Sequence, residues 1–203
     1  LTRIRSELEV DLADPDHADL VSTHRSVLEE AAALQRLVED LLHLARSDAA
    51  AAEPHRQPVD LDDIVLKVAA GVRAEERVVV VTAAVTAVQV LADGPQLTRA
   101  LTNLAENAAR HAASRVEFSA ALEAGWAVVT VADDGPGIPA AERERIFDRF
   151  ARLDDARQRD RGGSGLGLAI ARDIAERHGG TLILDATTSA GARFVLTLPD
   201  SSG

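Results

Sequence analysis

Glycines at alternate positions lead directly into an apolar helical pattern in this chain. The segment reads Gly163-Ser164-Gly165-Leu166-Gly167-Leu168. Because glycine has no Cβ, the backbone N–H groups of such a loop can close around a phosphate. The helix that follows adds unpaired N–H donors and the positive end of its dipole. A flexible turn before a helix explains the same glycines, so the segment predicts either an anion-binding loop or a plain connection.

Helical and strand periods alternate through residues 59–203. Apolar residues at helical spacing predict helices, the first with Asp60 as its N-cap, over residues 61–72, 93–111 and 166–178. A β-branched run predicts a strand over residues 77–81, followed by another short strand over 88–91. Alternating apolar residues predict strands over residues 116–122, 126–133, 182–184 and 194–198. Helices on one face of such a sheet define an α+β fold, a two-layer α/β sandwich with a mixed, mostly antiparallel sheet.

A heptad pattern of apolar residues fills the beginning of the chain. Leu20, Val27, Leu34 and Leu41 lie seven residues apart, which is typical of a helix in a coiled-coil-like bundle. Pro15 separates this helix from a short one before it, so the pattern predicts a helical hairpin. A single hairpin leaves its apolar stripe exposed. Two copies would form a four-helix bundle and hence a homodimer, and packing of the hairpin against its own chain is the alternative.

These patterns divide the chain into a dimerisation hairpin (1–50, with its contacts in 1–48), a linker (51–58) and a second domain (59–203). The net charge of −11 argues against a nucleic-acid surface, which needs a broad basic face. The absence of cysteine excludes disulfides and thiolate metal sites. No Gly-Lys-Ser or Gly-Lys-Thr occurs, which excludes a P-loop. No apolar run approaches the ~20 residues that a membrane span needs.

Two asparagines mark one face of the predicted helix over 93–111. Asn103 and Asn107 are four residues apart, and Arg110 lies near the same stripe. Asparagine is a poor residue for the middle of a helix, so a pair in register needs a reason. One reason is Mg²⁺, which takes oxygen ligands, few from protein and several from phosphates and water. The alternative is that both asparagines point to water.

An acidic turn and a charged segment follow. Asp133 ends a strand and enters a turn shaped by Gly135 and Gly137. Its carboxylate could accept a hydrogen bond from the amino group of a base, or it could simply cap the turn. Phe147 and Phe150 would then anchor a loop onto the domain. Arginines and acids crowd residues 143–161, which indicates either a lid over phosphates or a solvated loop.

The order and spacing of these motifs resemble the catalytic and ATP-binding domain of sensor histidine kinases in two-component systems. That family belongs to the ATPase superfamily shared with gyrase and a heat-shock chaperone. His178-Gly179-Gly180 and residues 196–199 resemble its closing elements, and residues 1–48 resemble the dimerisation hairpin before the domain. The resemblance implies ATP and Mg²⁺ as cofactors. It also implies γ-phosphoryl transfer to a histidine, and then to an aspartate of a response-regulator receiver domain.

The resemblance also implies roles for individual residues. Asn107 would ligate Mg²⁺, and Asn103 would lie beside the γ-phosphate. Arg110 would contact phosphate, Arg152 would reach the phosphoryl group in transfer, and Asp133 would bind the adenine amino group. The other nucleotide-binding positions would be Gly135, Gly137, Gly163, Ser164, Gly165, Leu166, Gly167 and Leu168.

One departure concerns the phosphoacceptor. In the family this histidine opens a His-Glu-Leu-Arg-Thr-Pro motif, and no histidine of this chain opens such a motif. Because Leu1-Thr2-Arg3 resembles the residues just after the motif, we expect the acceptor to lie before Leu1. We therefore expect this chain to bind Mg–ATP without phosphorylating itself. We also expect it to be the cytoplasmic part of a membrane-anchored sensor, with any membrane contact made by segments outside this sequence.

Two other functions remain open. An ATP-hydrolysing clamp ATPase of the same superfamily would need a general-base carboxylate where Asn103 stands. A non-catalytic dimerisation or docking module would not need intact asparagine, aspartate and glycine positions. Both alternatives are therefore less favoured than a kinase.

Overall fold

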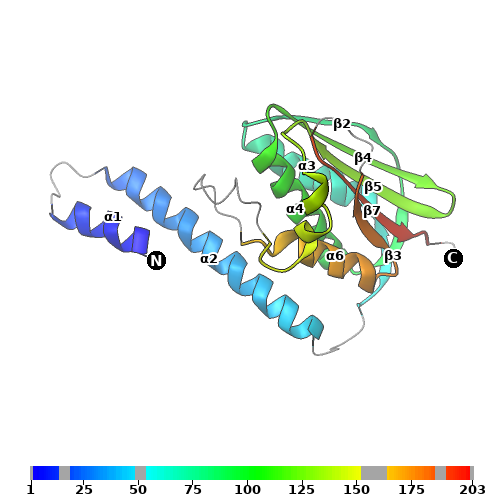
Figure 1. Cartoon of the computed structure of the whole chain (residues 1–203), viewed down its shortest axis with the longest axis horizontal. Helices are drawn as coiled ribbons and strands as arrows, with labels where there is room; N and C mark the ends of the chain where they lie inside the picture. The colour runs from blue at the N-terminus through cyan, green and yellow to red at the C-terminus, as the bar shows by residue number, and fades with distance from the viewer. Residues whose placement is uncertain (1, 14–18, 49–53, 152–163, 186–190, 202–203) are drawn as a thin grey trace. The chain divides into compact units, whose positions relative to one another are not determined.

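The structure is a computed structural model that describes residues 2–13, 19–48, 54–151, 164–185 and 191–201 (Figure 1). The chain separates into two compact units, Leu1–Ala49 and Ala50–Gly203. In the described part of the chain, no helix is both long and apolar enough to cross a membrane.

The first unit is a helical hairpin, as the heptad pattern predicts. Helix α1 (Thr2–Ala13) packs against helix α2 (Leu20–Asp48). Asp19 caps α2, because its carboxylate accepts the N–H of Ser22 at 3.1 Å. Apolar side chains of α2 nevertheless stay exposed, among them Leu20, Val38 and Leu41. The hairpin alone therefore does not bury its own apolar stripe.

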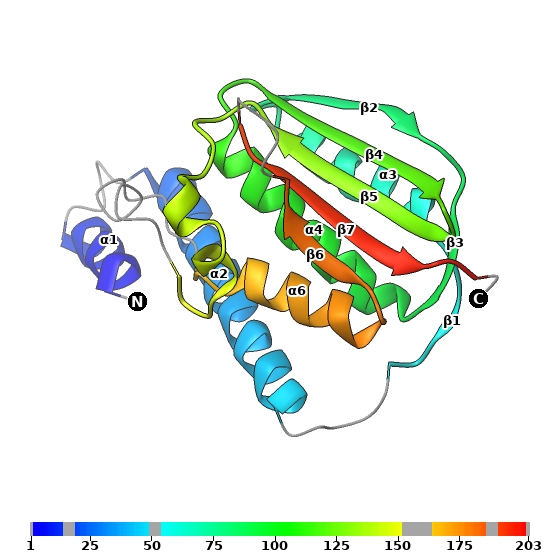
Figure 2. The same cartoon turned by 45° about the vertical axis from the view of Figure 1, so that its right-hand side comes forward.

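The second unit is built on a five-stranded sheet (Figure 2). Its strands are β2 (Val79–Val85), β4 (Arg115–Glu123), β5 (Trp126–Asp133), β6 (Thr181–Leu184) and β7 (Arg193–Pro199). They lie in the order β2-β4-β5-β7-β6. Only the β2–β4 pair is parallel, and the other three pairs are antiparallel. The predicted mixed, mostly antiparallel sheet is confirmed.

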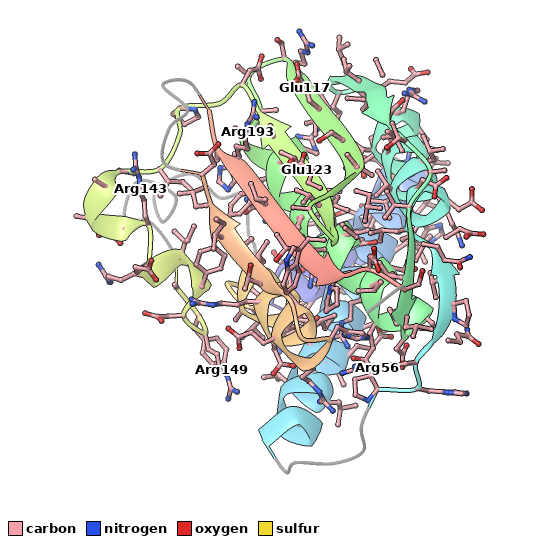
Figure 3. All side chains as sticks on the ribbon, turned by 90° about the vertical axis from the view of Figure 1, so that its right-hand side faces the viewer. Arg56, Glu117, Glu123, Arg143, Arg149 and Arg193 are labelled. Atoms are coloured by element: carbon pink, nitrogen blue, oxygen red, sulfur yellow. The ribbon has the colours of Figure 1, made fainter. Side chains whose placement is uncertain are left out.

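In the described part of the chain, three helices cover one face of this sheet, which completes the predicted α+β two-layer sandwich (Figure 2). They are α3 (Leu61–Ala74), α4 (Gly94–His111) and α6 (Gly167–Arg177). Alternate strand residues such as Phe118, Val131 and Phe194 are buried beneath them. Glu117 and Arg193 alternate with buried residues and lie on the face that the helices leave open (Figure 3). The strand period of two therefore assigns each side chain to one face.

A two-stranded sheet lies where the sequence predicts only a linker and a short strand. Strand β1 (Gln57–Asp60) pairs antiparallel with β3 (Gln89–Ala92). Asp60 precedes α3 in extended backbone, as an N-cap should, but its side chain makes no cap hydrogen bond. It accepts instead from Nε2 of Gln89 at 2.9 Å. Asp60 is therefore the N-cap residue of α3, as predicted, but its carboxylate bonds to the neighbouring strand instead of capping the helix.

Candidate functional site

Helix α4 supplies the asparagines of the site. It begins where the Asp93 carboxylate accepts the N–H of Gln96 at 3.1 Å. Asn103 and Asn107 are half-buried on this helix. Nδ2 of Asn103 is buried and has no hydrogen-bond partner among the described residues. The Asn103 side chain faces the start of α6, because a Cβ built on Gly167 would lie 3.4–3.5 Å from it. Asn103 therefore does not simply point to water.

Asp133 ends β5 with its two carboxylate oxygens in different surroundings. Oδ1 accepts the N–H of Gly135 at 2.9 Å and the N–H of Ala192 at 3.3 Å. Oδ2 is buried and has no hydrogen-bond partner within the described residues. Burial raises the pKa of Asp133, although the two N–H groups and nearby His111 pull that pKa down. One oxygen is fixed by the protein, and the other is left as a buried acceptor.

Five buried side-chain polar atoms of the described residues have no hydrogen-bond partner, and two of them, Asn103 Nδ2 and Asp133 Oδ2, belong to predicted site residues. A buried polar atom without a partner costs about 1–3 kcal/mol, so native proteins contain few of them. Nδ2 of Asn103 can only donate a hydrogen bond, and an ionised carboxylate oxygen such as Oδ2 of Asp133 can only accept one. A ligand that offers an amino group at one end and anionic oxygens at the other satisfies both. The adenine amino group and the phosphates of ATP fit this requirement.

Glycines let three segments meet around Asp133. A Cβ on Gly135 would overlap the carbonyl oxygen of His111, at the end of α4. A Cβ on Gly191 would overlap the carbonyl oxygen of Asp133 itself. Only glycine fits such close approaches of backbone to backbone. Gly137 also lies against Gly191, because a Cβ on Gly137 would lie 2.9 Å from the Gly191 carbonyl oxygen.

The segment before α6 is the described part of the glycine-rich loop. Ser164 Oγ accepts the N–H of Leu166 at 3.3 Å, and Gly165 O accepts the N–H of Phe150 at 2.9 Å. Leu166 is fully buried, whereas Leu168 is half-buried in the first turn of α6. Gly163 and Arg152 lie outside the described residues.

The charged segment before this loop is described as far as residue 151. The short 3-10 helix η1 (Ala140–Glu142) precedes this segment and η2 (Arg145–Phe147) lies within it, and Figure 3 labels Arg143 and Arg149 on either side of η2. Phe147 is buried edge-to-face against Phe194, with ring centroids 6.2 Å apart. Phe150 is 61% exposed. The prediction that both phenylalanines anchor this loop therefore holds for Phe147 and is wrong for Phe150. Its backbone, not its ring, is what meets Gly165.

His111, the last residue of α4, lies close to the Asp133 turn. Its pKa is lowered mainly by burial and also by the charge of Arg110, while Asp133 opposes the shift. The imidazole therefore lies within electrostatic reach of both predicted site residues. No role in nucleotide binding was predicted for His111. Its position next to Arg110 was the available signal, but its closeness to Asp133 depends on a non-local approach.

Asp134 is a second residue of this turn for which no role was predicted. Its Oδ1 accepts the N–H groups of Ala113, Ser114 and Arg115 at 2.9, 2.9 and 3.0 Å. Its Oδ2 accepts the hydroxyl of Ser114 at 2.6 Å. These donors lie in the connection between α4 and β4 and at Arg115, the first residue of β4. The only signal in the sequence was its place between Asp133 and Gly135.

Residues 92–202 match the family described as histidine kinase-, DNA gyrase B-, and HSP90-like ATPase. The match takes in α4, the Asp133 turn and the loop before α6. The chain belongs to this ATPase family. Within the family, it has the ATP-binding kinase core of sensor histidine kinases, as the following relatives and solved structures indicate.

Among curated proteins, the chain is 39% identical to sensor protein IrlS of Burkholderia pseudomallei, over 98% of this chain and 44% of IrlS. It is 37% identical to the sensor-like histidine kinase SenX3 of Mycobacterium tuberculosis, over 93% of this chain and 47% of SenX3. The chain thus spans less than half the length of these relatives.

Solved structures agree with this assignment. The mycobacterial sensor histidine kinase MprB aligns with a TM-score of 0.63 and 32% identity, over 72% of this chain and 98% of that chain. Full-length ShkA in complex with AMPPNP aligns with a TM-score of 0.74 and 32% identity, over 89% of this chain and 39% of that chain.

Proposed function

We propose that this chain binds Mg–ATP and donates the γ-phosphoryl group to a histidine imidazole, from which it passes to an aspartate of a response-regulator receiver domain. The observation that carries the proposal is the buried Oδ2 of Asp133, which lacks a partner while Oδ1 is held by two backbone N–H groups. An adenine amino group is the donor that this oxygen requires.

The phosphate end of the site would be formed by α4 and the start of α6. Asn107 would ligate Mg²⁺ through its amide oxygen, which adds no negative charge against the phosphates. Nδ2 of Asn103, buried without a partner, would donate to a phosphate oxygen, and Arg110 would add positive charge. When bound, Mg²⁺ offsets charge on the phosphate oxygens. Because Asn103 carries an amide, it cannot act as the general base that a clamp ATPase needs.

The loop from Gly163 to Leu168 would cover the phosphates. Backbone N–H groups at the start of α6 have no partners within the helix, and they suit an anion. Gly135, Gly137, Gly165 and Gly167 would shape the backbone around the nucleotide. The role of Arg152 at the transferred phosphoryl group rests on the resemblance to the family. In that transfer the bond from the γ-phosphorus to the bridging oxygen breaks, ADP leaves, and an imidazole nitrogen bonds to the phosphorus.

The partners follow from the first unit and the family. The exposed apolar side chains of α2 support a homodimer through residues 1–48, in a four-helix bundle. The acceptor histidine and the receiver domain would lie outside this sequence. We also propose that the chain is the cytoplasmic part of a membrane-anchored sensor.

Replacement of one atom at Asp133 tests the adenine assignment. Asp133→Asn keeps Oδ1 as the acceptor for Gly135 and Ala192 but can place an NH₂ donor where Oδ2 stands. Two donors would then face each other, so we expect Mg–ATP affinity to fall at least about tenfold. The loss should be smaller for GTP, which carries a carbonyl in place of the amino group. Calorimetry measures both affinities.

Glu123→Gln, at the end of β4 and on an exposed side chain, is the matched control. It removes one carboxylate charge far along the strand and should leave ATP affinity unchanged. Circular dichroism should give the same spectrum for all three proteins. Equal Mg–ATP affinity for the wild type and Asp133→Asn would contradict the adenine assignment.

A further inference from the structure

We infer that Asp134 is a positioning residue that fixes the distance between the adenine end and the phosphate end of the proposed site. The inference rests on the nucleotide-binding function proposed above. It gives a role to an exposed side chain whose hydrogen bonds all go to residues that hold no part of the nucleotide.

The Asp134 carboxylate accepts four hydrogen bonds. Oδ1 accepts the successive N–H groups of Ala113, Ser114 and Arg115, and Oδ2 accepts the Ser114 hydroxyl. The Asp134 N–H donates to the carbonyl of Arg115 at 3.3 Å. Successive backbone N–H groups that converge on one anion form a concave anion site. Here the anion is the carboxylate of Asp134 itself, and it holds three successive residues of the chain that follows α4.

The residues on either side of these hydrogen bonds belong to the two ends of the proposed site. Before Ala113 the chain is α4, with Asn107 about one turn from its last residue, His111. Next to Asp134 are Asp133, with its orphaned Oδ2, and Gly135, whose backbone touches His111. Movement of the connection relative to Asp134 would therefore change the distance between the α4 asparagines and the Asp133 carboxylate. A ligand that contacts both ends is sensitive to this distance.

The negative charge of Asp134 strengthens its hydrogen bonds to residues 113–115. The pKa of Asp134 is held well below its usual range, first by the Ser114 hydroxyl and then by the backbone N–H groups of Ser114 and Arg115. The side chain is thus an anion at neutral pH, and its hydrogen bonds are charge-assisted. An asparagine keeps an acceptor at the Oδ1 position, where the three N–H groups converge. The geometry can therefore be kept while the charge is removed.

The test compares Asp134→Ala with Asp134→Asn in the full chain. We expect Asp134→Ala to lower Mg–ATP affinity about tenfold, and Asp134→Asn to lower it only about threefold, because asparagine keeps the acceptor for the three N–H groups but loses the charge that strengthens these bonds. Adenosine lacks phosphates and reaches only one end, so its affinity should fall less than that of Mg–ATP. Calorimetry is done at a temperature where circular dichroism finds every variant folded.

A purely structural role predicts a different pattern. Asp134→Ala would then unfold at lower urea concentration but bind Mg–ATP as the wild type does, and this result would overturn the inference. Equal losses for Asp134→Ala and Asp134→Asn would overturn it too, because the shared acceptor geometry would not matter. If Asp134→Ala does not fold, Asp134→Glu replaces it. This variant keeps the charge but moves both oxygens by one methylene, so a loss of several-fold is expected and an unchanged affinity is the contrary result.

The Mg–ATP affinity of the wild type distinguishes failure of this inference from failure of the proposed function. If the folded wild-type chain takes up no Mg–ATP, the proposed function fails. If the wild type binds Mg–ATP and the Asp134 variants bind it equally well, only the role of Asp134 fails.

Discussion

Gly191 touches the backbone of Asp133, so single atoms at this position control the shape of the site. We expect Gly191→Ala to lower the free energy of unfolding by at least about 2 kcal/mol, because the new Cβ overlaps the Asp133 carbonyl and the residue has a positive φ of 74°. Urea denaturation measures the change. The matched control is Gly71→Ala in α3, where a Cβ meets nothing within 4 Å. It should raise stability by about 0.5–1 kcal/mol, and a loss of similar size at both positions would contradict the steric argument.

Asn107 is the proposed metal ligand, and its removal should affect only metal-dependent binding. We expect Asn107→Ala to lower ATP affinity in excess Mg²⁺ at least about tenfold, to the level measured with EDTA. Thr102→Ala on the same helix removes a hydroxyl that bonds to the Thr98 carbonyl and should leave the Mg²⁺ dependence intact. A full Mg²⁺ effect in Asn107→Ala would refute the assignment.

Among single residues, the site candidates that could be predicted are those whose motif is local in the sequence. Asn103 and Asn107 stand out because helical spacing alone puts them on one face, and Asp133 stands out because it ends a strand before two glycines. Asp134 was missed because its partners lie 19 to 21 residues away along the chain. His111 was missed for the same reason, since its approach to Asp133 joins two separate elements.

At the scale of elements, His178 joins the two helices that bear the site. Its Nδ1–H donates to the carbonyl of Ile174 in α6 at 2.7 Å, and its Nε2 accepts the N–H of Asp93 at the start of α4 at 3.0 Å. These bonds require a neutral imidazole, since a protonated Nε2 cannot accept. The pKa of His178 is lowered mainly by burial, with the charges of Arg56 and Arg177 acting in the same direction and Asp93 against them.

The sign of this shift gives a pH dependence. The unfolded chain binds a proton at His178 near pH 6.5, whereas the folded chain resists it, so the stability from this residue is present above about pH 6.5 and declines below that value. Urea midpoints between pH 7.5 and 5.5 should therefore fall less steeply in His178→Gln than in the wild type. His111, whose pKa is also lowered, titrates in both proteins and cancels in the comparison. Parallel curves would exclude His178 as a source of acid sensitivity.

Elements with local start and stop signals were predicted well. The helix expected over 93–111 is α4 at Gly94–His111, because Asp93 and the proline after Gly94 mark its beginning. Strand β1 was not predicted, since Gln57-Pro58-Val59-Asp60 has no clear alternation and gains its structure from pairing with β3. Strand β2 begins at Val79, two residues after the expected start at Arg77. The residues before Val79 belong instead to the turn after α3, where Glu76 has a positive φ of 53°.

At the scale of the whole molecule, the buried apolar core belongs to one unit. Among the described residues, every buried hydrophobic side chain lies between Leu61 and Leu198. We therefore expect residues 54–203 alone to fold and to bind Mg–ATP as the full chain does. Calorimetry and urea denaturation of the shortened chain test this. A nucleotide affinity that depends on the presence of residues 1–53 would be the contrary result.

The first unit should determine the oligomeric state. Leu41 on α2 and Leu66 on α3 are each 44% exposed, so Leu41→Glu and Leu66→Glu place the same charge at equally accessible positions. We expect Leu41→Glu to raise the dimer dissociation constant at least about tenfold, because a charge would enter an apolar helix contact, and Leu66→Glu to leave it unchanged. Sedimentation equilibrium measures both constants. A monomeric wild type at high concentration would contradict the proposed bundle.

The route by which the chain enters the second unit has a mechanical consequence. Nη2 of Arg56 donates to the carbonyl of Arg177 at the end of α6 at 2.9 Å, and β1 pairs with β3, which runs into Asp93 and α4 (Figure 3 labels Arg56). The proposed nucleotide contacts lie toward the other ends of these helices. A force transmitted through the polypeptide at residue 56 would therefore reach α4 and α6 at the ends remote from the nucleotide. Tension in the backbone and nucleotide binding would then act on opposite ends of the same two helices.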